Sequence, residues 1–471
     1  MSSYAPPSPC PHFEQALAPF LVDDGLPFAE VLPAAAVAQA FADEGVTFGA
    51  ARRSVFTPAL TLWAFLSQVL HANKSCRAAV LRVAVLLLAL GRRPCALDTA
   101  AYCRARAKIP AGVLRRLTVQ VADGLEDAVP ARWRWHGRRV QLVDGTTMTL
   151  PDTPENQQAY PQAPHQKPGL GFPIIRLVVL LSLATAALHG MALAPYCGKQ
   201  TGETALLRQL LAEVDAGDVL LADRFYCTYW LVALAQARGV DVVFRLHQCR
   251  HYDFRRGRRL GAADHVVVWH RPQRPDWMDA ATYATIPTTL TVRELEYAIV
   301  TPGCRTKSVM IATTLTDADA YPRLAVADLY HERWHAELDI RAIKQSLQMD
   351  HLRCQTPFMV DKEIWAHFLG YNLVRKVSAQ AALAQGRHPR DISFSACQQA
   401  VTAAWGQWPR FAAAERVRQG ADLLVVLGRA RVGNRPDRCE PRAVKRRPKE
   451  YDRLMKPRGQ ARAELLAPRE R

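Results

Sequence analysis

The sequence lacks a paired-cysteine motif and lacks an apolar stretch long enough to cross a membrane. Its eleven cysteines are scattered, and no two have C-x2-C spacing. This distribution argues against a zinc site or a disulfide framework and fits a reducing compartment. The longest apolar run, Leu177–Leu188, has 12 residues and is interrupted by Ser182 and Thr185, whereas a transmembrane helix needs about 20. The N-terminus also lacks a secretory signal pattern. We therefore expect a cytoplasmic protein, without membrane contact.

Acidic residues are few relative to basic ones. The chain has 61 Lys or Arg and 43 Asp or Glu, a net charge of +18 with a pI near 9.7. Such an excess points to a polyanionic partner, above all nucleic acid. Half of the excess lies in residues 429–471, where 15 Lys or Arg face 6 Asp or Glu. This segment, with Lys445, Arg446 and Arg447, is rich in proline and predicts a flexible arm that contacts the DNA backbone.

The 471 residues, 49% of them hydrophobic, suffice for two or three domains with a substantial core. Residues 1–130 have mainly helical patterns and are predicted to form a DNA-end-binding domain. Arg104, Arg106 and Lys108 lie there on a short basic helix, which a second helix follows at Val113–Leu125. A basic helix–turn–helix arrangement suits DNA contact, although an ordinary solvated basic surface is the alternative.

From residue 139 onward the pattern changes to that of an α/β fold. We expect strands at 139–144, 174–183, 186–193, 218–223 and 240–246, with helices at 203–215 and 227–238. This order matches that of a ribonuclease H-like sheet. Residues 247–316 read as short strands and predict a β-rich insertion within a core of 131–355. Residues 356–428 then predict a helical C-terminal region that precedes the basic tail.

Two of the expected strands end in an aspartate. Val140–Asp144 reads VQLVD before Gly145-Thr146, and Asp218–Asp223 reads DVLLAD before Arg224. Each apolar run followed by an acid indicates a strand that delivers a carboxylate at its C-terminal edge. Either aspartate by itself could equally cap a turn.

A third acid lies in a predicted helix, Ala325–Leu347. Tyr330, Arg333, Glu337 and Lys344 follow the spacing Y-x2-R-x3-E-x6-K, which places them within about 60° on one helical face. A carboxylate flanked by such cations suits a phosphodiester, because the acid can hold a metal and the bases can hold phosphate oxygens. An amphipathic helix with ordinary i,i+4 salt bridges is the alternative.

Together, Asp144, Asp223 and Glu337 would form a set of converging carboxylates. Three such groups repel one another unless a cation neutralises them. Oxygen ligands without His or Cys favour magnesium or manganese.

These motifs resemble those of the bacterial insertion-sequence DDE transposases of the IS-four family. The shared features are Asp144-Gly145-Thr146, Asp223 after a hydrophobic strand, and the Tyr-Arg-Glu-Lys signature at Tyr330, Arg333, Glu337 and Lys344. The resemblance implies a ribonuclease H-like catalytic core that carries out two-metal phosphoryl transfer on DNA ends. It also implies an insertion that supplies an aromatic for a flipped base; Trp269, Trp277 and Trp334 are candidates.

The expected activity is therefore cut-and-paste transposition. The protein would bind the terminal inverted repeats of an insertion sequence and double-stranded target DNA. Two Mg²⁺ or Mn²⁺ ions would be its cofactors, and it would act as a homodimer at the nucleoid. A magnesium-dependent nuclease of the same fold and an inactive, transposase-derived DNA-binding protein are the alternatives.

Overall fold

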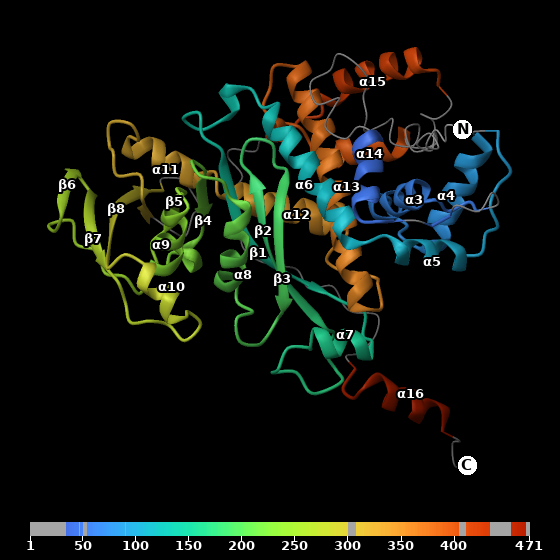
Figure 1. Cartoon of the computed structure of the whole chain (residues 1–471), viewed down its shortest axis with the longest axis horizontal. Coiled ribbons are helices and arrows are strands. Elements are labelled where there is room, and N and C mark those ends of the chain that lie inside the picture. The colour runs from blue at the N-terminus through green and yellow to red at the C-terminus, as the bar shows by residue number, and fades with distance from the viewer. Residues whose placement is uncertain are drawn as a thin grey trace, which may run out of the picture.

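A long mixed sheet forms the centre of the computed structural model, with helices on both faces and a helical bundle at one end (Figure 1). The structure describes residues 34–46, 48–49, 54–89, 91–299, 308–404, 411–433 and 454–467. Within these ranges the sheet has nine strands in the order β3-β2-β1-β4-β5-β9-β8-β7-β6. The strands are β1 (Val140–Thr149), β2 (Ile174–Ser182), β3 (Leu188–Pro195), β4 (Val219–Ala222), β5 (Asp241–Arg245), β6 (Arg258–Gly261), β7 (Asp264–His270), β8 (Thr289–Ala298) and β9 (Ser308–Thr313).

Most of the helices precede β1 or follow β9. The N-terminal helices are α2 (Ala34–Asp43), α3 (Pro58–Leu70), α4 (Cys76–Ala89), α5 (Ala100–Lys108) and α6 (Ala111–Asp127). Between the strands lie α7 (Pro154–Ala159), α8 (Glu203–Leu210), the short turn η4 (Arg224–Tyr226), α9 (Tyr229–Ala237) and α10 (Ala280–Thr285). After β9 come α11 (Arg323–His331), α12 (Trp334–Arg341), α13 (Pro357–Ala384), α14 (Phe394–Ala404), α15 (Ala413–Leu427) and α16 (Arg458–Leu466).

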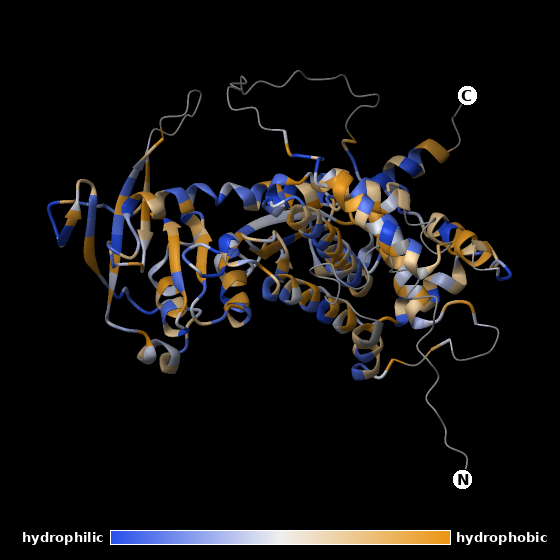
Figure 2. Cartoon of the chain, turned by 90° about the horizontal axis from the view of Figure 1, so that it is seen from above, coloured by the Kyte–Doolittle hydropathy of each residue, from blue (hydrophilic) through white to orange (hydrophobic). Residues whose placement is uncertain are grey.

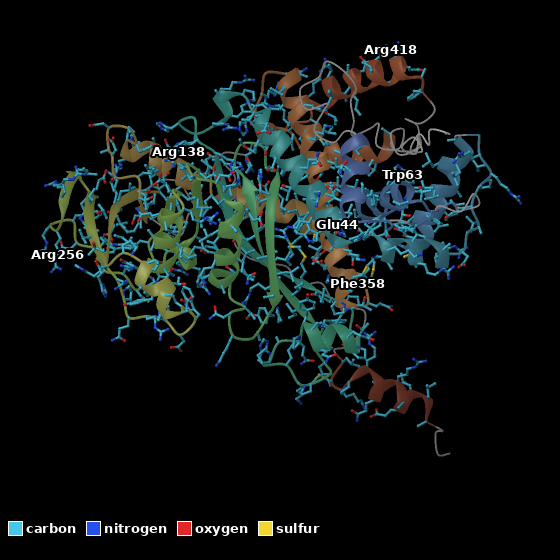
Figure 3. The ribbon with its side chains drawn as sticks, viewed as in Figure 1. Glu44, Trp63, Arg138, Arg256, Phe358 and Arg418 are labelled. Atoms are coloured by element: carbon cyan, nitrogen blue, oxygen red, sulfur yellow. The ribbon has the colours of Figure 1, made fainter. Side chains whose placement is uncertain are left out.

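The first five strands confirm the predicted order of elements. β1, β4 and β5 run parallel, whereas β2 and β3 pair antiparallel on the other side of β1. Strands β6 to β9 lie within the predicted β-rich insertion, and they extend the same sheet because β9 pairs with β5. The hairpin at the outer end of the sheet is largely hydrophilic (Figure 2), and Arg256 lies at this edge (Figure 3).

Both faces of the central strands are buried, which explains their nearly continuous apolar sequences. Alternate residues of β1 and β2, such as Leu142 and Val179, join the core that includes α6 and α13. Their neighbours, such as Val143 and Val178, join a second core with α8 and α9. The two sets alternate because successive strand side chains point to opposite faces. Helix α13, 28 residues long, runs from the sheet into the N-terminal bundle, where Trp63 is buried (Figure 3).

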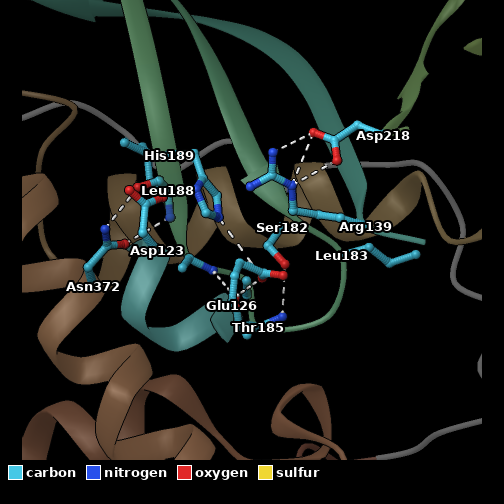
Figure 4. A network of polar contacts seen from close by, with 12 residues as sticks. Asp123, Glu126, Arg139, Ser182, Leu183, Thr185, Leu188, His189, Asp218 and Asn372 are labelled. Carbon is cyan, nitrogen blue, oxygen red and sulfur yellow. Dashed lines mark hydrogen bonds and ion pairs between the residues drawn. The ribbon is translucent and has the colours of Figure 1, made fainter. Parts of the chain in front are cut away.

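A buried polar network fixes the strands that carry the predicted site (Figure 4). Arg139, just before β1, donates to Asp218, just before β4, with an Nη2–Oδ2 distance of 2.6 Å. On the far side of the hairpin, the Leu188 N–H donates to the Asn372 side chain of α13 at 2.8 Å. Because Arg139 and Asp218 stand at the starts of adjacent parallel strands, their ion pair helps set the register of β1 against β4.

The predicted single helix at Ala325–Leu347 is wrong in one respect, because the structure divides it. The N–H groups of Glu332 and Arg333 bond to carbonyls three residues earlier, at Leu329 and Tyr330, both at 3.1 Å. This tighter winding separates α11 from α12, and a wider, π-helical turn follows at Ala342–Ser346. The four signature residues are therefore distributed over α11, the tight turn, α12 and the π-helical turn.

The basic tail contains one helix that the sequence analysis does not predict. α16 is exposed except at the half-buried Ala461, and Pro457 just before it lies against the loop at Gly169. Lys445, Arg446 and Arg447 lie outside the described residues. Among the described helices, none is both long enough and apolar enough to span a bilayer.

Candidate active site

Asp223 directly follows β4, and Asp144 lies beside it in the middle of β1, because β1 runs past β4 to Thr149. The predicted end of this strand at Asp144 is therefore wrong, since β1 continues beyond Asp144 in its pairing with β2. In the register of β1 and β4, Leu142 pairs with Leu221, so each aspartate lies two residues beyond a matched pair. The Asp144 carboxylate accepts the Gly145 N–H at 2.8 Å. The Asp223 carboxylate accepts the Phe225 N–H at 2.8 Å and caps the turn η4. The strand geometry thus brings together two of the three predicted catalytic acids.

The third acid, Glu337, lies on α12, whose residues pack against β1 near Asp144. Its carboxylate forms an ion pair with Arg333 at 2.9 Å. The charges of Glu337 and Asp223 both act on Asp144. The structure therefore brings the three acids within electrostatic range of one another, with Arg333 among them.

The environment of Asp144 disfavours its charged form. Its pKa is raised to about 6, mainly by burial and to a smaller extent by the charges of Glu337 and Asp223. The Gly145 N–H and the Arg333 guanidinium act in the opposite direction. A buried acid among acids is a recurrent feature of functional sites, since ionisation there requires a compensating cation.

The donor set suits a divalent cation, because it consists of carboxylate oxygens without His or Cys. In the described part of the chain, however, no three His, Cys, Asp or Glu side chains are grouped closely enough to hold a metal ion. Glu337 pairs with Arg333 instead. The expectation that all three carboxylates lie within metal-sharing distance is thus not met in this arrangement, and their role as ligands stays a prediction.

The other signature residues face the protein more than the solvent. Tyr330 is 8% exposed, and burial raises the pKa of its phenol to about 12. Lys344 donates to the Thr147 carbonyl at 2.9 Å and to the Thr146 hydroxyl at 3.3 Å. Lys344 therefore ties the signature segment to β1 immediately after Asp144. A grip on phosphate by Tyr330 and Lys344 stays a prediction, because their hydrogen-bonding groups are largely engaged within the protein.

Two residues near the site were missed by the sequence analysis. Glu203, the first residue of α8, accepts a hydrogen bond from the buried Tyr226 hydroxyl at 3.3 Å and interacts with the charge of Asp223. Arg245 ends β5, the strand next to β4, and its charge acts on Tyr330. Only Arg245 has a sequence signal, a charged residue at the end of a buried strand. Glu203 has the pattern of an ordinary acid in the first turn of a helix.

The predicted basic residues of the N-terminal region differ in their environments. Arg104 and Lys108 are exposed on α5. Arg106 instead donates to the Gln68 side chain at 3.0 Å and lies over the rings of Phe65 and Tyr102. Arg106 therefore contributes to the helical bundle, which leaves its predicted DNA contact without structural support.

The three candidate tryptophans differ in the exposure of their rings. Trp269 is buried and donates to Glu294 at 2.8 Å, with the Arg250 guanidinium 3.7 Å from its ring centre. Trp277 is half-buried beneath Arg208. Trp334, at the start of α12, is 54% exposed. Of these three, only Trp334 has a largely free ring.

Comparisons with known proteins agree with this arrangement. The family model described as Transposase DDE domain matches residues 135–373, about half of the chain, and includes Asp144, Asp223 and Glu337. The transposase InsG of insertion sequence element IS4 from Escherichia coli (strain K12) is 26% identical over 399 residues, covering 83% of this chain and 86% of InsG. The putative transposase InsZ of the same organism is 30% identical over 146 residues, 31% of this chain and 48% of InsZ.

Among solved structures, the chain is similar to a piggyBac transposase in a synaptic complex with hairpin DNA. The TM-score is 0.40 with 11% identity, over 88% of this chain and 85% of that one; this likeness is too low to support a shared fold. The family match and the long alignment to InsG, by contrast, both span the strands and the helix that carry the three acids. The chain therefore belongs to the DDE transposases of the IS4 (IS-four) family, enzymes that cut DNA and transfer its strands.

Proposed function

We propose that the protein binds the terminal inverted repeats of an insertion sequence, cleaves the DNA there and joins the freed end to a target. The observation that carries this proposal is the placement of Asp144 in β1 beside Asp223 at the end of β4, with Glu337 in electrostatic range of Asp144. The order β3-β2-β1-β4-β5, with β1, β4 and β5 parallel, supports a ribonuclease H-like core.

Asp144 and Asp223 would hold divalent cations, two Mg²⁺ or Mn²⁺ ions, and Glu337 would complete the ligand set. When bound, such ions supply an activated water and stabilise the leaving oxygen. The raised pKa of Asp144, caused first by burial and then by the charges of Glu337 and Asp223, supports this role, because a cation would stabilise the ionised carboxylate. The residues of the chain then contribute mainly position and charge, as is usual in phosphoryl transfer.

Arg333 has the geometry to couple DNA binding to the acids. Its guanidinium pairs with Glu337 at 2.9 Å, and its side chain is 18% exposed. A DNA phosphate would compete with Glu337 for this guanidinium and so leave the carboxylate available to a cation. Tyr330 beside Arg333, and Lys344 through its hydrogen bonds to β1, would keep Arg333 and Asp144 at a fixed separation.

The remaining regions would bind and align the DNA. Residues 1–130 would recognise the transposon end, with Arg104 and Lys108 on its exposed surface. Residues 131–355 would form the catalytic core, 356–428 a helical support and 429–471 a basic arm. Two ends must be joined in one complex, so we infer a homodimer that acts on DNA at the bacterial nucleoid.

A cleavage and joining assay tests the proposed function. The purified protein is incubated with Mg²⁺ and duplexes that carry the DNA flanking its coding region, and with scrambled duplexes as the control. We expect end-specific nicks followed by joined products. Cleavage without joining would identify a nuclease, and binding without cleavage would identify an inactive DNA-binding protein.

Substituting Arg333 tests the proposed phosphate grip. Arg333→Lys retains the positive charge but loses the planar fork that can hold a phosphate through two hydrogen bonds. We expect cleavage to fall by about 10- to 100-fold, with unchanged thermal unfolding. Arg341→Lys, an exposed position on the same helix, is the matched control. Equal cleavage by the two variants would show that Arg333 contributes charge alone.

Deleting the tail from Arg435 onward tests its role in DNA binding. We expect the remaining chain to fold and to bind end and random duplexes more weakly by a similar factor. The dependence of binding on salt should become shallower, by about 0.9 in the logarithmic slope for each DNA phosphate that the tail neutralises in the full-length protein. Binding is measured across a salt series for both proteins. An unchanged slope would exclude a DNA arm, and loss of end preference alone would place recognition in the tail.

A further inference from the structure

A fourth acidic side chain, Glu203, lies against the backbone that carries Asp144. If Gly145 had a Cβ atom, that atom would lie 2.4 Å from the Glu203 Cδ and 2.5 Å from its Oε1. The backbone of Gly145 is not in the left-handed region that favours glycine. A side chain at Gly145 would therefore displace the Glu203 carboxylate, the far end of a flexible side chain.

The Glu203 carboxylate has a specific partner, the hydroxyl of Tyr226. Tyr226 is completely buried at the end of η4, and its hydroxyl donates to Glu203 Oε2 at 3.3 Å. The charges of Asp144 and Asp223 also act on this phenol. This buried donor thus lies within electrostatic range of three carboxylates, and Glu203 is the one that accepts its hydrogen bond.

A buried hydroxyl needs an acceptor, since an unpaired polar group is costly away from water. If Glu203 were absent, the phenol would turn toward Asp144 or Asp223. A carboxylate that accepts this hydrogen bond has fewer lone pairs for a cation. The position against Gly145 and the hydrogen bond from Tyr226 together give Glu203 a function in the arrangement of the two aspartates.

We propose that Glu203 is a positioning residue that keeps the Tyr226 hydroxyl away from Asp144 and Asp223, so that both carboxylates remain available to a divalent cation. The inference rests on the proposed function, in which these aspartates bind the ions. Glu203 itself touches neither ion nor DNA in this scheme. Its contribution is to accept one hydrogen bond, and the carbonyl of a glutamine can do the same.

Four variants of the full-length protein separate this role from the alternatives: Glu203→Ala, Glu203→Gln, Tyr226→Phe and the double variant Glu203→Ala/Tyr226→Phe. Binding of Mn²⁺ without DNA is measured by calorimetry, alongside cleavage in Mg²⁺ and thermal unfolding. We expect Glu203→Ala to weaken Mn²⁺ binding by about tenfold or more, as is typical when a group behind the ligands is removed. Glu203→Gln and Tyr226→Phe should bind Mn²⁺ nearly as the parent does.

The double variant shows whether Glu203 acts through the Tyr226 hydroxyl or directly through its own charge. Removing the phenol should restore Mn²⁺ binding and cleavage in the Glu203→Ala background, because no hydroxyl is left to compete for the aspartates. Failure of this rescue, or a loss in Glu203→Gln equal to that in Glu203→Ala, would overturn the proposal and show that the charge of Glu203 acts directly. Parent-like binding by Glu203→Ala would overturn it as well.

A substitution at Gly145 provides an independent check. Gly145→Ala should push the Glu203 carboxylate away and weaken Mn²⁺ binding as Glu203→Ala does, and Tyr226→Phe should again restore part of the loss. Asp144→Ala identifies failure of the proposed function itself. If Asp144→Ala binds Mn²⁺ as the parent does, the aspartates are not the ligands. If Asp144→Ala loses Mn²⁺ binding but the Glu203 and Gly145 variants do not, only the proposed role of Glu203 is wrong.

Discussion

Replacing Asp144, Asp223 or Glu337 by Ala is expected to lower metal-dependent DNA cleavage by at least about 10²–10³-fold. Asp144 lies in β1, Asp223 directly follows β4 and Glu337 lies on α12, and the charges of Asp223 and Glu337 both act on Asp144. Each would supply oxygen ligands that no neighbouring group replaces. Binding of the transposon end should persist, because the basic surfaces that would contact the DNA lie elsewhere.

The measurement is single-turnover cleavage of an end-containing duplex, with binding of the same duplex measured in parallel. Asp276→Ala, at an exposed acid in the insertion, is the matched control and should cleave normally. Thermal unfolding shows whether each variant is folded. Near-normal turnover by any one of the three variants would remove that residue from the active site.

Asp339→Ala is expected to lower the free energy of unfolding by about 3–5 kcal/mol, the usual effect of removing one partner from a buried ion pair. Asp339 is 1% exposed, two residues beyond Glu337. Its two oxygens bind Arg375 at 2.6 Å and Arg390 at 3.0 Å. Arg390 also donates to the carbonyls of Ser182 and Leu183 at the end of β2. The substitution would leave two buried guanidinium groups without a carboxylate.

Chemical denaturation of Asp339→Ala and of Asp328→Ala measures this effect. Asp328 is an exposed acid on α11, so its loss should change the free energy of unfolding by only about 0.5 kcal/mol. The free energy of unfolding of Asp339→Asn should lie between those of Asp339→Ala and Asp328→Ala, because the amide can accept one hydrogen bond without charge. Equal stability of Asp339→Ala and Asp328→Ala would show that the ion pairs do not hold α12 in place.

Local sequence patterns predicted most of the strands, but they missed β6 and the part of β1 that continues beyond Asp144 to Thr149. The apolar runs before Asp144 and Asp223 predicted β1 and β4 because a strand buried on both faces reads as a continuous apolar segment. The other insertion strands were also recognised from their alternation and turn signals. Uniform helical spacing, however, predicted one helix through Glu337, and the tight turn at Glu332–Arg333 was missed because nothing in the sequence marks it.

What the sequence by itself determined is therefore the family, the strand order and the identity of the candidate acids. These depend on short motifs and on periodicity, which are local properties of the chain. Only the tertiary structure decided how the side chains pair: Arg333 with Glu337, Lys344 with β1, and Glu203 with Gly145 and Tyr226. Such contacts join residues up to about two hundred positions apart, as between Lys344 and Thr147. They arise from the packing of α8 and α12 against the sheet, which no local pattern encodes.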